Sequence, residues 1–95
     1  MKTIDESALE EFSTALAALQ NPEDIRMVLQ EILTPGERHD IGLRWRLLQM
    51  LQAGIPQRAI AKTLGVSLCK ITRGSRELRK RKSVIREILP PYKQD

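Results

Sequence analysis

The sequence is poor in aromatic residues and in cysteine. Phe12, Trp45 and Tyr92 are the three aromatic residues among 95, so we expect a core of Leu, Ile, Val and Ala. The single cysteine, Cys69, excludes a disulfide framework within the chain and fits a reducing compartment. The sequence also lacks an apolar signal-peptide region at its start and any apolar run of about 18 residues. These absences predict a cytoplasmic protein that is neither secreted nor embedded in a membrane.

The residue clusters that carry out catalysis are missing as well. The chain has one histidine and one cysteine, and it has no glycine-rich loop that could cradle a phosphate. No set of side chains offers a nucleophile, a base and an oxyanion site together. We therefore predict that the protein is not an enzyme and that it holds neither a metal nor a cofactor.

Charge is divided unevenly along the chain. Residues 1–40 carry three basic and nine acidic side chains, a net charge of −6, and residues 41–95 carry thirteen basic and three acidic ones, a net charge of +10. Such a distribution suits a protein that presents its basic half to a polyanion. Ribosomal and membrane-surface proteins are basic too, so charge favours nucleic acid as the partner without establishing it.

Apolar residues recur at helical spacing throughout the chain, and no segment alternates as a strand does. Helix starts are indicated at Asn21-Pro22 and at Thr34-Pro35-Gly36-Glu37, where the second has the pattern of a capping box. A third helix is expected to end at Gly54, and a short last helix is expected at Ser83–Leu89. The sequence therefore predicts one all-α domain over residues 1–95, with about six helices.

The helices of residues 1–54 carry more apolar surface than a small domain can bury by itself. Chains of this size often gain stability by burying such surface in a partner subunit. We therefore expect residues 1–54 to supply the dimerisation surface of a homodimer. The short helix at 83–89 should dock on another element, because an isolated helix of that length is not stable.

Residues 56–76 have the spacing of a helix-turn-helix. Gly65 supplies the positive φ that ends a first helix, and Ser67 can cap a second one. Ile71 follows one turn later, where it can be buried against Ile60. In this motif the second helix lies in the DNA major groove, so we predict a protein that binds double-stranded DNA.

The candidate DNA contacts fall into three groups. The exposed start of the second helix can reach base edges or a thymine methyl group, and the first turn of the preceding helix suits contacts at the groove rim. A basic tract after the motif would hold phosphates without reading sequence, unless it is only a solvated linker. The candidates are Ser67, Leu68, Cys69, Lys70 and Thr72 in the second helix, Gln57 and Arg58 in the first, and Arg79, Lys80, Arg81 and Lys82 in the tract.

Four short segments, in this order, match the pattern of one family. They are Leu33-Thr34-Pro35-Gly36-Glu37-Arg38, Arg44-Trp45-Arg46, Gln57-Arg58 and Ile71-Thr72-Arg73-Gly74-Ser75. Together they resemble the tryptophan operon repressor family over Leu33–Leu78, about half of the chain. Residues 1–32 match only as helices of suitable length. The resemblance implies an intertwined homodimer that binds L-tryptophan as a corepressor and then operator DNA.

The resemblance also implies which residues bind the ligand. Arg44 and Arg73 match two arginines that sandwich the indole ring, and a guanidinium group can stack on an aromatic face and pair with a carboxylate. Gly74 matches a glycine that packs close to the ligand. Leu33 and Thr34 match the contribution of the partner subunit, where carbonyl groups take the ligand ammonium. From the residues alone, Arg73 could instead contact a phosphate and Arg44 could extend into solvent.

Three features depart from the family pattern. The turn Gly54-Ile55-Pro56-Gln57 is one residue shorter than expected and lacks a Ser or Thr cap. Glu77 stands where a serine would face the ligand ammonium, so its carboxylate strengthens tryptophan binding or selects another amine. The tract Arg76–Lys82 has five basic residues in seven. The first alternative is therefore a regulator of the same fold that senses a different ligand or none. The second is the DNA-binding fragment of a transposase or recombinase, against which the lack of an acidic catalytic cluster counts.

Overall fold

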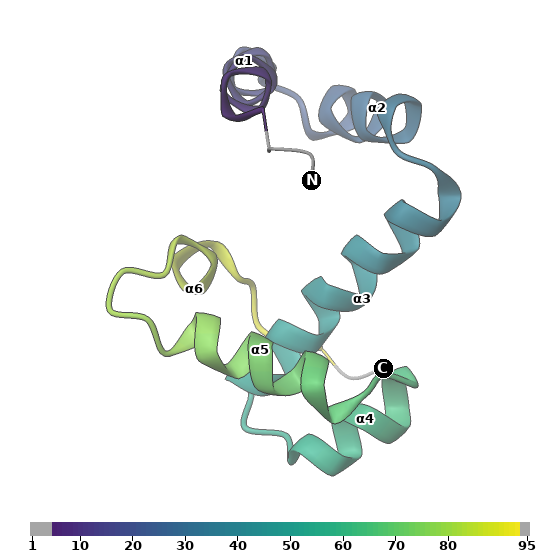
Figure 1. Cartoon of the computed structure of the whole chain (residues 1–95), viewed down its shortest axis with the longest axis vertical. Helices are drawn as coiled ribbons and strands as arrows, with labels where there is room; N and C mark the ends of the chain where they lie inside the picture. The colour runs from purple at the N-terminus through teal and green to yellow at the C-terminus, as the bar shows by residue number, and fades with distance from the viewer. Residues whose placement is uncertain (1–4, 94–95) are drawn as a thin grey trace. The chain divides into compact units, whose positions relative to one another are not determined.

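The computed structural model describes residues 5–93 of the chain and contains six helices and no strand in that range (Figure 1). The helices are α1 (Glu6–Ala17), α2 (Pro22–Ile32), α3 (Pro35–Gln52), α4 (Gln57–Leu64), α5 (Leu68–Leu78) and α6 (Val84–Ile88). The prediction of an all-α chain with about six helices is confirmed.

The chain divides into two compact units, Met1–Arg38 and His39–Asp95. The first unit contains α1, α2 and the first turn of α3. The second contains the rest of α3 together with α4, α5 and α6.

Side-chain caps begin each helix of the first unit. The Asp5 carboxylate accepts a hydrogen bond from the Ala8 amide at 3.1 Å, and the Asn21 side chain caps α2 in the same way. At the start of α3, the Thr34 amide donates to Oε1 of Glu37 at 2.8 Å, and the Glu37 amide donates to the Thr34 hydroxyl at 3.1 Å. The capping box predicted at these residues is therefore confirmed. Its hydrogen bonds from Thr34 hold the pKa of the Glu37 carboxyl below its ordinary value of 4.5.

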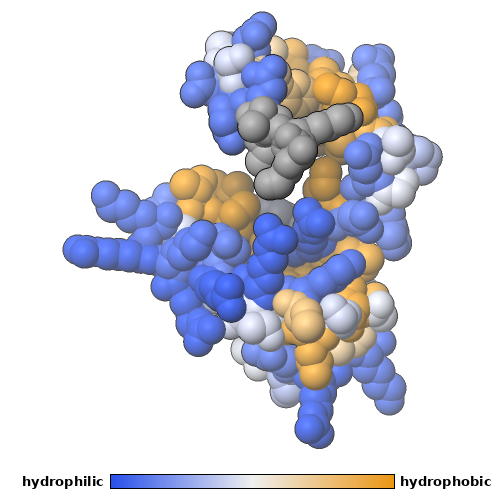
Figure 2. Space-filling model, viewed as in Figure 1, coloured by the Kyte–Doolittle hydropathy of each residue, from blue (hydrophilic) through white to orange (hydrophobic). Residues whose placement is uncertain are grey.

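The apolar faces of α1 and α2 are not buried within the chain. Neither helix contains a buried residue. Leu9 is 54% exposed, Met27 50% and Ile32 58%. Figure 2 shows the corresponding apolar areas, in orange, on the surface of this unit. Apolar surface in water is unfavourable by about 25 cal/mol per Å² relative to buried surface. The first unit therefore has an apolar surface that another molecule could cover.

The core of the second unit lies where α4 and α5 pack on the C-terminal half of α3 (Figure 1). Ile60 and Ile71 are fully buried, and Leu47 and Met50 are 4% and 3% exposed. The predicted burial of Ile71 against Ile60 is confirmed. Partly buried side chains surround this cluster, namely Leu48, Leu51, Ile55, Ala61, Leu64, Val66 and Tyr92.

In this unit, α3 and α4 each end at a glycine with positive φ. Gly54 has φ of 82° after α3, and Gly65 has φ of 65° after α4. The backbone amide of the residue after each glycine donates a hydrogen bond to a carbonyl of the preceding helix. The donor–acceptor distance is 3.1 Å for Ile55 and 3.2 Å for Val66. Both side chains then pack against the core. These hydrogen bonds and apolar contacts are those of glycine-capped helix ends, and they set the directions in which α4 and α5 begin.

The starts of α4 and α5 differ in their caps. Pro56 precedes α4 and makes no side-chain hydrogen bond to it, as the absence of a Ser or Thr predicts. The Ser67 hydroxyl caps α5 by accepting the Lys70 amide at 3.4 Å. The predicted cap of the second helix is confirmed.

The apolar residues of α6 are not buried. Hydrogen bonds made by residues in and beside the helix hold it in place. Ser83 is 7% exposed and accepts the Arg86 amide at 3.1 Å. The Arg86 guanidinium donates to the carbonyl of Leu78 at 2.9 Å and to that of Arg81 at 3.1 Å. Beyond the helix, the buried Gln49 amide donates to the Pro90 carbonyl at 3.2 Å. Within the second unit, hydrogen bonds thus link the segment after α5 to Leu78 of α5 and to Gln49 of α3.

Candidate ligand pocket and nucleic-acid interface

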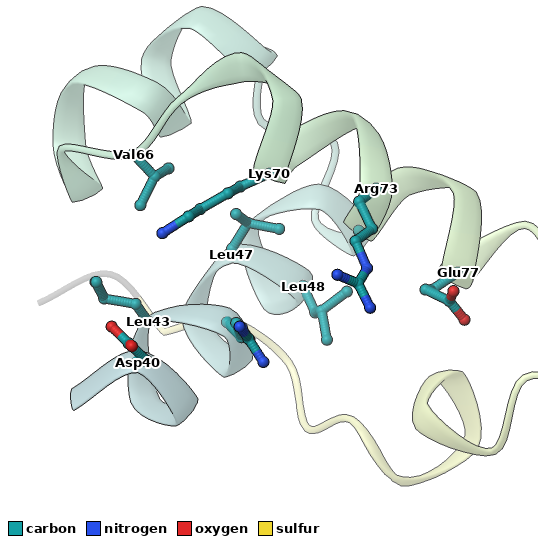
Figure 3. Close-up of a pocket in the computed structure, with 10 residues that line it drawn as sticks. Asp40, Leu43, Leu47, Leu48, Val66, Lys70, Arg73 and Glu77 are labelled. Carbon is teal, nitrogen blue, oxygen red and sulfur yellow. The ribbon is translucent and has the colours of Figure 1, made fainter. Parts of the chain in front are cut away.

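A pocket of 290 Å³ opens between α3 and α5 in the second unit (Figure 3). Small-molecule sites in proteins have volumes of about 300–1,000 Å³ and combine an apolar lining with a few polar groups. This pocket has that composition. Its apolar walls are Leu43, Leu47, Leu48 and Val66, and its other lining residues are Asp40, Arg44, Lys70, Arg73, Gly74 and Glu77.

The fold brings together four of the residues that the family resemblance assigns to the ligand. Arg44 comes from α3, and Arg73, Gly74 and Glu77 come from α5. Lys70, which the sequence assigns to DNA, also lines the pocket. Asp40 has no role in the sequence interpretation. Its position one helical turn before Arg44 is the signal that could have placed both on one face of α3.

Leu33 and Thr34 belong to the first unit, at the junction of α2 and α3. Arg38 holds this junction by donating to the Leu33 carbonyl at 2.8 Å and to the Gln30 carbonyl at 3.0 Å. The capping box of Thr34 and Glu37 holds it from the other side. The Leu33 carbonyl is thus fixed in direction, and its second lone pair is available for another donor.

Gly74 allows α5 to approach α3 closely. A Cβ atom at this position would lie 2.6 Å from Cδ2 of Leu47, 3.3 Å from Cδ1 of Leu51 and 3.4 Å from Cδ2 of Leu48. The first distance is shorter than a carbon–carbon contact permits, so any larger residue would displace Leu47. The resemblance assigns Gly74 to close packing against the ligand, whereas the close contacts of Gly74 in this structure are with leucines of α3.

The charged side chains of the pocket differ in their partners. Within residues 5–93 there are two ion pairs, Arg26 with Glu23 and Lys80 with Glu77. The Lys80 ammonium lies 2.8 Å from Oε2 of Glu77. Its hydrogen bond lowers the pKa of the Glu77 carboxyl, and the charges of Lys80, Arg73 and Arg76 lower it further. Glu77 is therefore ionised at neutral pH and places a negative charge at its end of the pocket.

The candidate DNA contacts are accessible in the structure. Leu68 is 51% exposed at the first residue of α5, and Cys69 is exposed beside it. The Thr72 hydroxyl donates to the Leu68 carbonyl at 2.9 Å, which leaves its oxygen free to accept. Exposed positions in the other groups are Gln57 and Arg58 in the first turn of α4 and Arg79, Lys80, Arg81 and Lys82 after α5. Figure 2 shows strongly hydrophilic side chains projecting from the end of α5 and the loop that follows.

No helix among the described residues is long and apolar enough to cross a membrane. The same residues contain no group of three or more His, Cys, Asp or Glu side chains that could hold a metal ion.

Comparison with known proteins places the chain in a family. The family described as "Trp repressor protein" matches residues 7–92. The chain is 35% identical over 80 residues to the Trp operon repressor homolog of Chlamydia trachomatis serovar L2, which covers 83% of this chain and 85% of the relative. It is 36% identical over 74 residues to the homolog of Vibrio cholerae serotype O1, covering 73% and 72%. A homolog from Xylella fastidiosa is also 36% identical over 74 residues, covering 77% and 80%. No solved structure is significantly similar.

These matches define the class of the protein as a helical, DNA-binding regulator of transcription and not an enzyme. The chain belongs to the Trp repressor family. The resemblance of the four segments is therefore confirmed. The family match also includes α1 and α2. The four segments alone had related residues 1–32 to the family only as helices of suitable length.

Proposed function

We propose that this chain is a transcriptional repressor that binds operator DNA as a homodimer and requires L-tryptophan as its corepressor. One observation carries the proposal. The pocket between α3 and α5 brings Arg44 and Arg73, two residues far apart in the sequence, to one apolar cavity next to the exposed start of α5.

The chemistry of the pocket suits an aromatic amino acid. The leucine side chains exclude water from a ring, and two guanidinium groups can stack on its faces and pair with the α-carboxylate. The ionised Glu77 can attract the α-ammonium group. Leu33 and Thr34 of the partner subunit complete the site in this proposal, with the fixed Leu33 carbonyl accepting a hydrogen bond from the ammonium.

The dimer is supported by the apolar surface of the first unit. Leu9, Met27 and Ile32 are each at least half exposed, and the described residues of α1 and α2 form no core of their own. In the proposed dimer these faces are buried against the second copy. A folded monomer in solution at micromolar concentration would contradict this part of the proposal.

The α4–α5 pair acts in this proposal as a helix-turn-helix, with the start of α5 in the major groove. Ser67, Leu68, Cys69, Lys70 and Thr72 then face the bases, and Gln57 and Arg58 lie near the groove rim. The tract Arg79–Lys82 supplies phosphate contacts that are independent of sequence. Two such heads in a dimer engage half-sites about 34 Å apart.

Ligand binding controls DNA binding in this mechanism by fixing the angle of α5 relative to α3. A tryptophan ring held between Arg44 of α3 and Arg73 of α5 links the reading helix to the dimer core. The α4 helix lacks a side-chain cap, so the head is held weakly when the pocket is empty. A ligand that favours the competent angle by about 1–3 kcal/mol is sufficient for a switch.

A second candidate function is a regulator of this family that senses a different amine or no ligand. Two observations favour it, namely the ion pair of Glu77 with Lys80 at the pocket and the short connection between α3 and α4. The family assignment counts against the remaining alternative, a transposase or recombinase fragment.

Calorimetric titration tests the proposed ligand. L-Tryptophan should bind the parent protein, whereas tryptamine and indole-3-propionate, which lack the carboxylate and the ammonium respectively, should bind more weakly. Arg44→Ala and Arg73→Ala should abolish tryptophan binding and ligand-dependent operator binding. Arg58→Ala is the matched control, because it removes an exposed arginine outside the pocket and should weaken DNA binding alone. Tryptophan binding that survives in both pocket variants, or that is absent in the parent, would refute the assignment.

A further inference from the structure

The pocket has charged groups at two opposite ends. Figure 3 shows Lys70 and Asp40 at one end, Glu77 at the other, and Arg73 between them. Leu43, Leu47 and Leu48 line the space from one end to the other. A ligand that fills the pocket therefore meets polar side chains with both of its ends.

The two ends differ in how their charges are satisfied. Glu77 is paired with Lys80. Asp40 and Lys70 take part in neither of the two ion pairs found in residues 5–93, and both side chains are exposed. They lie on different helices, α3 and α5, so a group held between them would also link those helices. Water can satisfy both charges while the pocket is empty, but a bound ligand displaces the part of that water that lies inside the pocket.

L-Tryptophan by itself does not satisfy this end of the pocket. Its charged groups are both on the α-carbon, and the proposed function directs them to the arginines and Glu77. The far edge of the ring is a hydrocarbon. Placing it against an ammonium and a carboxylate removes the part of their hydration that faces the pocket without replacing it, which is unfavourable.

We propose that Asp40 and Lys70 form a second polar subsite, which binds a hydroxyl group on the ring of the ligand. Ring-hydroxylated tryptophans are then a second ligand class of the same site, in which the hydroxyl group adds to the affinity that the tryptophan skeleton provides. This inference rests on the proposed function, because the ring must lie between Arg44 and Arg73 with its α-carbon toward Glu77.

A hydroxyl is the substituent that suits both residues. An ionised carboxylate can only accept hydrogen bonds, and an ammonium can only donate them. A hydroxyl donates to Asp40 and accepts from Lys70 at the same time. A ring carboxylate would be repelled by Asp40, and a ring ammonium would be repelled by Lys70. A methyl group has about the size of a hydroxyl and bonds to neither.

The test compares ligands that differ in that one group. L-Tryptophan, its 5-hydroxy and 6-hydroxy derivatives and its 5-methyl and 6-methyl derivatives are titrated calorimetrically into the full chain without DNA. We expect the better hydroxy derivative to bind at least about tenfold more tightly than the methyl derivative of the same position, because a site that hydrogen-bonds a hydroxyl discriminates against analogues that lack it. Omitting DNA keeps the proposed DNA contact of Lys70 out of the measurement.

Three variants attribute the preference to the two side chains. In Asp40→Asn, Lys70→Met and the double variant, the advantage of the hydroxy ligand over the methyl ligand should shrink and then vanish, while L-tryptophan still binds. Lys62→Met is the matched control, because Lys62 is an exposed lysine of α4 outside the pocket and should leave every affinity unchanged. Circular dichroism verifies the helix content of each variant.

The failure of this inference can be distinguished from failure of the proposed function. If no derivative and no tryptophan binds, the corepressor assignment is wrong and the subsite falls with it. If tryptophan binds but hydroxy and methyl derivatives bind equally, the subsite is wrong and the proposed function stands. A preference that persists in the double variant, or a variant that loses all ligands equally, would also overturn the subsite.

Discussion

Gly74 of α5 and Leu47 of α3 are in such close contact that a Cβ atom at residue 74 would lie 2.6 Å from Cδ2 of Leu47. Leu47 is 4% exposed and belongs to the core, and it also lines the pocket. The packing of the core and the shape of the pocket therefore depend on the same pair of residues.

Gly74→Ala should destabilise the protein and weaken ligand binding together. The added methyl group must displace Leu47, and overpacking of this kind costs about 1–3 kcal/mol. The displaced side chain then narrows the pocket or alters its wall. Urea unfolding at one fixed protein concentration measures the stability, and calorimetry measures the affinity for tryptophan.

Gly42→Ala is the control for this substitution. Gly42 lies inside α3, and nothing is within 4 Å of the position its Cβ would occupy. Alanine is favoured over glycine in a helix interior by about 1 kcal/mol, so this variant should be as stable as the parent or more so. Gly74 also lies inside a helix, so a Gly74→Ala protein that gains as much stability as Gly42→Ala would show that Leu47 moves without cost.

Acid should destabilise the protein partly through Glu37. The pKa of its carboxyl is lowered in the folded state from 4.5, chiefly by the hydrogen bond from the Thr34 amide. A lowered folded-state pKa means that this stabilisation is complete above 4.5 and is lost as pH falls through the folded-state value. Glu37→Gln should therefore lose less stability than the parent between neutral pH and the region below 4.5.

Urea unfolding at a series of pH values checks this expectation. Glu31→Gln serves as the reference, because Glu31 is an exposed glutamate of α2 outside the capping box. Equal acid sensitivity in the two variants would mean that the capping box contributes nothing to it.

Much of the fold was predictable because its boundaries depend on local backbone chemistry. Gly65 adopts the positive φ that its place between two helical patterns requires, and Ser67 accepts the amide expected of an N-cap. The capping box of Thr34 and Glu37 forms for the same reason. The burial of Ile60 with Ile71 follows from spacing alone, since both lie on the inner faces of adjacent helices.

The pocket was less predictable because it depends on residues that face each other across two helices. Helical spacing places Asp40 and Arg44 on one face of α3, but it does not state which residues of α5 lie opposite. That pairing follows from the close approach at Gly74, which turns Lys70 toward the pocket as well as Arg73. Amphipathic spacing likewise identifies the apolar faces of α1 and α2 without identifying what covers them.

The basic residues after α5 should contribute unequally to DNA binding. Arg81→Ala should reduce the slope of log affinity against log salt concentration by about 0.9 for each subunit, if Arg81 contacts a phosphate. Lys80→Ala should reduce it less, because Lys80 must leave Glu77 before it can reach DNA. The measurement is operator binding across a salt series, repeated on unrelated DNA. Equal reductions would indicate that the ion pair does not compete with phosphate.

Arg86 should position this basic tract. Its guanidinium donates to the carbonyl of Leu78, at the end of α5, and to that of Arg81, in the middle of the loop that follows. Arg86→Lys keeps the charge but loses this geometry, and an exposed interaction of this kind contributes roughly 0.5–1 kcal/mol, or about two- to fivefold in DNA affinity. Hydrogen exchange of the loop amides should become faster in the same variant. Unchanged exchange and unchanged affinity would show that the loop holds its shape without Arg86.

Cys69, the exposed and sole cysteine of the sequence, makes the proposed reading helix chemically addressable without any substitution. A thiol reagent should modify the free protein at one position, at the start of α5. Bound operator should slow that reaction and unrelated DNA should slow it less, provided that α5 enters the groove. The rate of modification therefore provides a footprint of the protein surface, measured from the side of the protein and not from the side of the DNA.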